Sequence, residues 1–180
     1  MRVLMMLIPD DEAAVPPSRP VLRMEHFVEP YYLFRDAAVE VVLASPAGGF
    51  PAMGLASEDP EPLPEAMHRF RADRIAREEL NDTLSLDQIY PDDFDAALCI
   101  GSPGRIWHQN DGSQAGAVIA AFLAAGKPVG VIPSVLDLAP HGTGEGLLIV
   151  GDGAGTPLLA AQALLGVLRG QTLPSEGTEL

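Results

Sequence analysis

Short apolar runs that alternate with helical stretches are the feature of this sequence that most limits its possible folds. Arg2 to Ile8 is a continuous apolar run, which is typical of a parallel strand covered on both faces. Four similar runs follow along the chain: Ala38–Ala44, Asp95–Ser102, Pro128–Pro133 and Gly146–Gly151. Such an alternation predicts an α/β fold, in which right-handed crossovers place helices on both faces of a parallel sheet.

The stretches between the apolar runs have helical spacing. We expect helices over Met24–Ala37, Pro64–Asn81, Gly112–Lys127 and Thr156–Gly170. Gly126 is expected to end the third helix as a left-handed cap, and residues 85–94 are expected to form a short helix or turn. Residues 171–180 are polar and frayed in this interpretation. The chain is therefore predicted to form one domain over residues 1–170, followed by a polar tail.

The charge of the chain excludes several classes of partner. It has 25 acidic and 11 basic side chains, a formal net charge of −14 at pH 7. Such a surface repels phosphate backbones and anionic lipid, so we expect no nucleic-acid and no membrane partner. No segment reaches the ~20 apolar residues that span a membrane. The apolar N-terminus is followed at once by acids, so it is interpreted as a strand and not as a signal sequence.

A single cysteine limits the redox chemistry. Cys99 cannot form an internal disulfide, which favours a reducing, cytoplasmic location. It stands inside an apolar strand, where burial raises the pKa of a thiol, so we interpret it as an inert core residue.

Motifs for cofactors and metals are missing from the sequence. It contains neither a G-x-G-x-x-G turn nor a phosphate-binding G-x-x-x-x-G-K-[ST] loop. His26, His68, His108 and His141 are scattered, without the HExxH or CxxC spacing of a metal site. We therefore expect no cofactor and no metal.

Four segments of the sequence carry a resemblance through their order and spacing. They are "EPYYLFRDAAVEVVLASPAGGFPAMG", "DTLSLDQIYPDDFDAALCIGSPGRIWH", "AAFLAAGKPVGVI" and "LLIVGDGAGTPLLAAQALLGVL". Together they resemble the DJ-1/PfpI superfamily, and in particular its type 1 glutamine amidotransferase-like branch with the Hsp31-like glyoxalases and chaperones. The resemblance implies a flavodoxin-like three-layer α/β sandwich with a mainly parallel sheet, and a homodimer. Only a short link, about "APHGTGEG", stands where the family has several dozen residues, so the C-terminal half is expected to be shortened.

The family's chemistry depends on three places, and this sequence departs at each. The nucleophile elbow typically reads K-P-V-x-x-V-C-H-G-P; Lys127, Pro128, Val129 and Ile132 match it, but Pro133 holds the cysteine position and Ser134 the histidine position. The carboxylate four residues before the proline of "PYY" is replaced by His26, with Glu25 beside it.

The third place is the loop G-G-H-G-x-x-W-D, whose backbone amides help to form the family's oxyanion hole. Here it reads Gly101, Ser102, Pro103, Gly104, Arg105, Ile106, Trp107, His108, so two glycines and the tryptophan remain. The resemblance implies a ligand pocket lined by Glu25, His26, Gly101, Ser102, Trp107, Pro133 and Ser134.

A proline cannot act as a nucleophile, and the family's covalent chemistry needs a thiolate. The sequence therefore does not predict a cysteine-dependent glyoxalase, amidase or protease. It favours a catalytically degenerate DJ-1/PfpI-like protein that binds a small molecule or serves as a dimeric scaffold.

Two enzymatic alternatives stay open, and His26 takes part in both. In the first, Ser134 is a nucleophile and His26 its base, with Glu25 or Asp137 orienting the imidazole. In the second, His26, with His108, is the general acid/base of a cofactor-independent isomerase, hydratase or lyase, and Trp107 forms an apolar wall of the pocket. The candidate catalytic residues are thus His26, Ser134 and His108.

Overall fold

The structure, a computed structural model, describes residues 1–9, 22–53, 64–101, 114–132, 146, 148–150 and 156–170. Within these ranges, six strands form one sheet in the order β3-β2-β1-β4-β5-β6. The strands are β1 (Arg2–Ile8), β2 (Glu40–Ser45), β3 (Leu84–Ser85), β4 (Ala96–Gly101), β5 (Val129–Ile132) and β6 (Leu148–Val150). Every described pair of neighbouring strands is parallel. The predicted α/β class with a parallel sheet is therefore confirmed.

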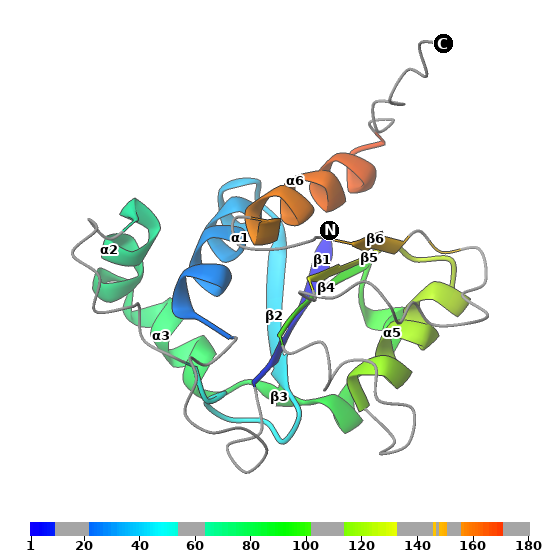
Figure 1. Cartoon of the computed structure of the whole chain (residues 1–180), viewed down its shortest axis with the longest axis horizontal. Coiled ribbons are helices and arrows are strands. Elements are labelled where there is room, and N and C mark those ends of the chain that lie inside the picture. The colour runs from blue at the N-terminus through cyan, green and yellow to red at the C-terminus, as the bar shows by residue number, and fades with distance from the viewer. Residues whose placement is uncertain are drawn as a thin grey trace.

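Helices cover both faces of the sheet (Figure 1). They are α1 (Met24–Asp36), α2 (Glu65–Ala72), α3 (Arg74–Asn81), α5 (Gln114–Ala124) and α6 (Thr156–Leu168), with 3₁₀ turns η1 (Leu86–Gln88) and η2 (Pro91–Asp93). The first three helices and α6 pack on one face, and α5 with the two turns packs on the other. The sheet is therefore the middle layer of a three-layer sandwich.

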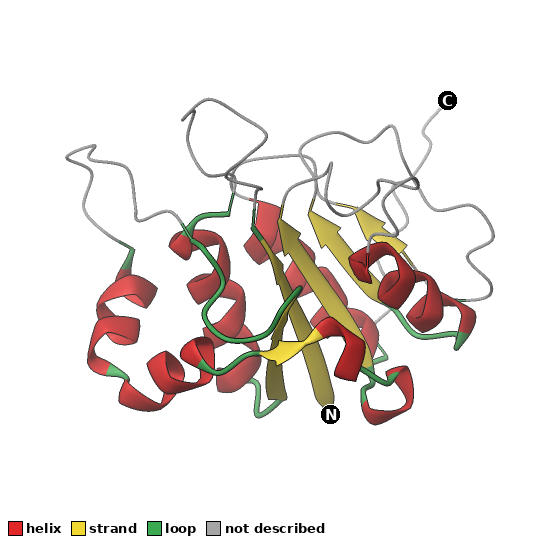
Figure 2. Cartoon of the chain, turned by 90° about the horizontal axis from the view of Figure 1, so that it is seen from below, coloured by secondary structure: helices red, strands yellow, loops and turns green. Residues whose placement is uncertain are grey.

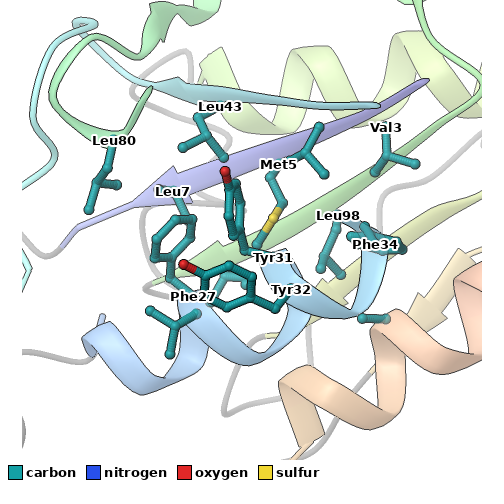
Figure 3. Close-up of a cluster of buried hydrophobic side chains, with 14 of the residues drawn as sticks. Val3, Met5, Leu7, Phe27, Tyr31, Tyr32, Phe34, Leu43, Leu80 and Leu98 are labelled. Carbon is teal, nitrogen blue, oxygen red and sulfur yellow. The ribbon is translucent and has the colours of Figure 1, made fainter. Parts of the chain in front are cut away.

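Alternation along β1 divides the core into two clusters, because successive side chains of a strand point to opposite faces. Val3, Met5 and Leu7 join the cluster under α1, α2, α3 and α6. Figure 3 shows Phe27, Tyr31 and Phe34 of α1 packed over these strand side chains and over Leu98 of β4. Leu4, Met6 and Ile8 join the cluster under α5 instead. Burial on both faces explains why β1 has an uninterrupted apolar sequence.

The order of the strands identifies the topology. Without the two-residue edge strand β3, the order β2-β1-β4-β5-β6 matches the flavodoxin-like order 2-1-3-4-5. The predicted flavodoxin-like sandwich is confirmed.

The structure differs from the sequence prediction in two details. The single helix expected over Pro64–Asn81 is two helices, because Asp73 has an extended backbone and its side chain accepts a hydrogen bond from the Ala76 amide at 3.1 Å. Asp73 thus ends α2 and caps the N-terminus of α3. The short strand β3 was not expected; it precedes the predicted turn, which forms as η1 and η2.

The C-terminal end of α5 has the predicted cap. Gly126 has a φ of +72°, and the amides of Gly126 and Lys127 donate to the carbonyls of Leu123 and Phe122 at 3.0 Å each. The predicted polar tail, residues 171–180, lies outside the described residues, and the assignment of residues 1–170 to one domain stays a prediction.

Candidate functional site

The carboxyl edge of the sheet is the place where this topology brings chemistry together. Because the strands run alike, their carboxyl ends meet at the edge away from the N-terminus (Figure 2). Ile8 pairs with Gly101, and Ile100 pairs with Ile132, so β1, β4 and β5 end at nearly the same level. From β1 the chain crosses to β2 on one side of the sheet, whereas from β4 it crosses to β5 on the other side. The direction of the connections therefore reverses between β1 and β4. Open α/β sheets bind ligands at such a topological switch point.

Helix α1 places two predicted site residues at this edge. It begins at Met24, after the chain has left the carboxyl end of β1, so its first turn lies at the same edge of the sheet. Met24, Phe27 and Val28 are buried against the sheet, and this burial fixes how the helix is rotated. Glu25 and His26 are both partly exposed in the first turn.

Glu25 and His26 lie on different flanks of α1. Neighbouring positions of a helix point about 100° apart and do not face each other. Glu25 shares a flank with Tyr32, which stands seven residues further along the helix. Tyr32 contacts Arg69 in the last turn of α2 and Asp73, the residue that ends α2. His26, one position further along and about 100° round the helix, does not share that flank. This geometry counts against Glu25 as the residue that orients the His26 imidazole.

The carboxyl group of Glu25 has an unusual environment. Its Oε2 atom is buried, and within the described part of the chain it accepts no hydrogen bond. A buried acceptor without a donor costs about 1–3 kcal/mol. A water molecule or a ligand that donates to this oxygen would remove that cost.

Gly101 has a structural reason to be glycine. A Cβ added there would lie against the carbonyl oxygen of Ile8 and 2.6 Å from the Ile8 Cβ. The carboxyl ends of β1 and β4 can therefore approach as closely as they do only because Gly101 has no side chain. The glycine that the sequence assigns to the oxyanion-hole loop thus also sets the geometry of the strand before that loop.

Cys99 lies two residues before Gly101 and inside the protein. It pairs with Met6 of β1 and Val131 of β5, and it belongs to the apolar cluster under α5. Its exposed fraction is 0 %, and burial raises the pKa of its thiol. The predicted burial of the Cys99 thiol in the core is confirmed, and its lack of reactivity stays a prediction.

Lys127, which matches the family's elbow motif, lies at the opposite edge. It precedes β5, and its Nζ donates to the carbonyl oxygens of Pro91 and Phe94, at 2.6 Å in both cases. These contacts tie η2 to the amino end of β5. The described contacts of Lys127 are therefore structural.

A buried polar network at the end of β2 was missed by the sequence analysis. The hydroxyls of Ser45 and Thr83 share a hydrogen bond at 2.8 Å, and Thr83 Oγ1 also donates to the carbonyl of Gly49 at 2.5 Å. The Gly49 amide donates back to the Thr83 carbonyl at 2.9 Å. The network anchors the first residues of the loop after β2 to β3. The only sequence signal for it was two small polar residues, Ser45 at the end of an apolar run and Thr83 after Asn81 and Asp82, and such residues are too common to be diagnostic.

Other predicted site residues cannot be compared with the structure. Ser102, Trp107, His108, Pro133, Ser134 and Asp137 lie outside the described residues, so their roles stay predictions. Over the described ranges, no group of three or more His, Cys, Asp or Glu side chains is arranged to hold a metal ion. Among the described helices, none combines the length and apolarity that crossing a membrane requires.

Comparison with known proteins defines the class of fold. No family model matches the sequence, and no curated protein matches it. Solved structures do match. Glyoxalase III from Candida albicans is 12% identical with a TM-score of 0.67, over 92% of this chain and 96% of that one. DJ-1beta from Drosophila melanogaster is 17% identical with a TM-score of 0.56, over 94% of this chain and 91% of that one.

A third match, to the rapid encystment protein of 24 kDa from Francisella tularensis, is 20% identical with a TM-score of 0.56. It covers 73% of this chain and 57% of that protein, so this chain spans less than two thirds of that neighbour's length. These likenesses show that the chain has the fold of the DJ-1/PfpI superfamily. The resemblance predicted from the sequence is thus confirmed at the level of the fold.

Proposed function

We propose that this chain is a DJ-1/PfpI-like protein without the superfamily's cysteine chemistry, and that it binds a small molecule noncovalently at the carboxyl edge of the sheet. The observation that carries the proposal is the burial of Cys99. It is the only cysteine in the sequence, and its side chain is in the core cluster under α5. A thiol with a raised pKa and no access to solvent cannot attack a carbonyl compound.

The carboxyl edge supports the binding part of the proposal. The first turn of α1 brings Glu25 and His26 to the edge, and Gly101 lets β1 and β4 end close together. The Oε2 of Glu25, which accepts no hydrogen bond from the described residues, is a buried acceptor that suits a ligand with an amine or hydroxyl donor.

The first experiment tests the loss of cysteine chemistry. One structural neighbour is named a glyoxalase, so methylglyoxal is the substrate to try. We expect the wild-type chain and Cys99→Ala to form no lactate above the uncatalysed rate. We also expect Cys99 to resist Ellman's reagent in the native protein and to react in urea. Turnover that disappears in Cys99→Ala would overturn the proposal.

The second experiment tests ligand binding. A panel of small carboxylates, amines and carbonyl compounds is screened by thermal shift, and each hit is titrated by calorimetry. His26→Ala is expected to weaken the binding of a hit about tenfold or more. His68→Ala, which removes an exposed histidine from α2, is the matched control and should bind normally. Equal affinity of the two variants would refute the placement of the site.

A repurposed acid/base enzyme is the second candidate function, favoured by the position of His26 in the first turn of α1. It predicts that a ligand from the panel is converted rather than only bound. Product formation by the wild type, abolished in His26→Ala but not in His68→Ala, would favour it over simple binding.

A further inference from the structure

Two oppositely charged side chains stand two positions apart where α1 begins. Arg23 is the N-cap residue of the helix and Glu25 lies in its first turn, so both are at the carboxyl edge of the sheet. Among the described residues, neither side chain forms an ion pair or a hydrogen bond with the other or with any third group. The other described arginines without a carboxylate partner are exposed, whereas Arg23 is partly buried; they are Arg71, Arg77 and Arg169.

The backbone sets the direction of the Arg23 side chain. With φ −105° and ψ 150°, this residue is extended, so its side chain points away from those of its two neighbours. Leu22 and Met24 are both buried in the core cluster under α1. The Arg23 carbonyl accepts a hydrogen bond from the His26 amide at 3.1 Å, which holds this turn in place. The guanidinium is therefore directed out of the core at the start of the helix.

The carboxylate of Glu25 supplies the opposite charge. Its Oε2 atom is buried and accepts no hydrogen bond from the described residues, although the side chain as a whole is partly exposed. Hydrogen bonds in which donor and acceptor are both charged are about twice as strong as those between neutral groups. The ammonium group of a ligand is thus the donor that would stabilise this oxygen most.

Repulsion between like charges decides which class of ligand fits both residues. An anion is attracted by Arg23 but repelled by Glu25 and by the net charge of −14. A simple amine pairs with Glu25 but is repelled by Arg23. A molecule that carries both charges can pair with each residue.

We propose that the ligand of this site is a zwitterion, whose ammonium group binds Glu25 and whose acid group binds Arg23. This inference rests on the proposed noncovalent site at the carboxyl edge of the sheet, and it names the chemical class of the ligand that the site takes.

Calorimetric titration with simple zwitterions tests this proposal. The probes are glycine, β-alanine, γ-aminobutyrate and 5-aminovalerate, which hold the two charges at increasing separations. Each is compared with the amine and the carboxylate of the same chain length, for example propylamine and butyrate for γ-aminobutyrate. We expect at least one zwitterion to bind about tenfold or more tightly than both of its singly charged comparisons.

Two variants test the two contacts separately. Glu25→Gln keeps the shape of the side chain but removes its charge, and it should weaken the binding of the best zwitterion about tenfold or more. Arg23→Gln should weaken it to a similar extent. The matched controls are Glu29→Gln, one turn further along α1, and Arg71→Gln on α2, and both should bind like the wild type. Circular dichroism checks that every variant is folded.

The outcomes separate this inference from the proposed function. Binding of a singly charged or neutral compound that His26→Ala weakens, but Glu25→Gln and Arg23→Gln do not, would overturn the zwitterion and leave the site in place. The same holds if no zwitterion binds more tightly than its comparisons, or if the controls weaken binding as much as the two variants. If no compound of this series or of the screening panel binds, both the site and the zwitterion are refuted.

Discussion

The hydroxyl of Tyr31 donates a hydrogen bond to Glu79 Oε2 at 2.6 Å and so joins α1 to α3. Tyr31 is fully buried, and Arg35 lies 3.4 Å from the other oxygen of the same carboxylate. The next residue of the helix, Tyr32, donates to Asp73 at 3.2 Å, and the Arg69 guanidinium lies over its ring. Figure 3 shows both tyrosines on α1 among the side chains of the cluster under this helix. These contacts hold α2 and α3 against α1, the helix that begins at the candidate site.

Removing the Tyr31 hydroxyl should destabilise the protein more than removing the Tyr32 hydroxyl. Tyr31→Phe loses a short, buried hydrogen bond to a carboxylate, which costs about 1–2 kcal/mol of unfolding free energy. Tyr32→Phe loses a longer bond and should cost about half as much. Urea denaturation measures both. Equal costs, or a larger cost for Tyr32→Phe, would contradict the assigned roles.

Lys127→Met should destabilise the protein without affecting the candidate site. The change leaves the carbonyls of Pro91 and Phe94 without their donor, which we expect to cost about 2 kcal/mol. Arg74→Met is the control, because it breaks an exposed ion pair with Glu78 that is worth at most about 0.5 kcal/mol. Chemical denaturation gives the stabilities. Lost binding of a ligand from the panel, with stability unchanged, would show that Lys127 serves the site.

Replacing glycine by alanine at two positions should destabilise the protein for two different reasons. Gly101→Ala places a Cβ against the backbone of Ile8, and the shift this forces should cost about 2–3 kcal/mol. Gly126→Ala meets no atom within 4 Å, and only its φ of +72° is unfavourable, so about 1 kcal/mol is expected. Melting and denaturant curves compare the two variants. A Gly101→Ala protein as stable as Gly126→Ala would mean that β1 and β4 separate easily.

Asp73 should make stability fall at acid pH. The hydrogen bond from the Ala76 amide, followed by that from Tyr32, lowers the pKa of the Asp73 carboxyl below its ordinary value. Because the folded pKa is the lower one, its contribution is complete above the unfolded pKa of about 3.9 and is lost as pH falls through the folded pKa. Asn at this position keeps a capping side chain but does not titrate. Unfolding free energy measured from neutral to acid pH should therefore fall less steeply for Asp73→Asn, and identical slopes would refute this role.

Much of the fold could be predicted because burial determines which neighbouring residues are apolar, and this pattern can be seen in the sequence. Residues 3–8 are apolar without interruption because both faces of β1 are covered, and Gly126 marks the end of α5 by its conformation. The break at Asp73 was missed because a capping aspartate inside a helical pattern resembles an ordinary surface residue. The strand β3 was missed because two residues are too few to show alternation.

The candidate site was only partly accessible to the same reasoning. Counting from Pro30 brought His26 to the carboxyl edge, but the counting could not show that Glu25 points about 100° away from it. The motif that predicts the elbow begins with Lys127, which lies at the amino end of β5, and its altered positions, Pro133 and Ser134, lie outside the described residues.

By itself, the sequence determined the parallel α/β architecture, the single cysteine and the acidic charge, because hydrophobic period and composition are properties of neighbouring residues. Only the tertiary structure decided that Cys99 is enclosed by β1, β5 and α5, that Gly101 is pressed against Ile8, and that one carboxylate oxygen of Glu25 is buried. Each of these depends on residues distant in the chain, and their separation is set by how the strands and helices pack together.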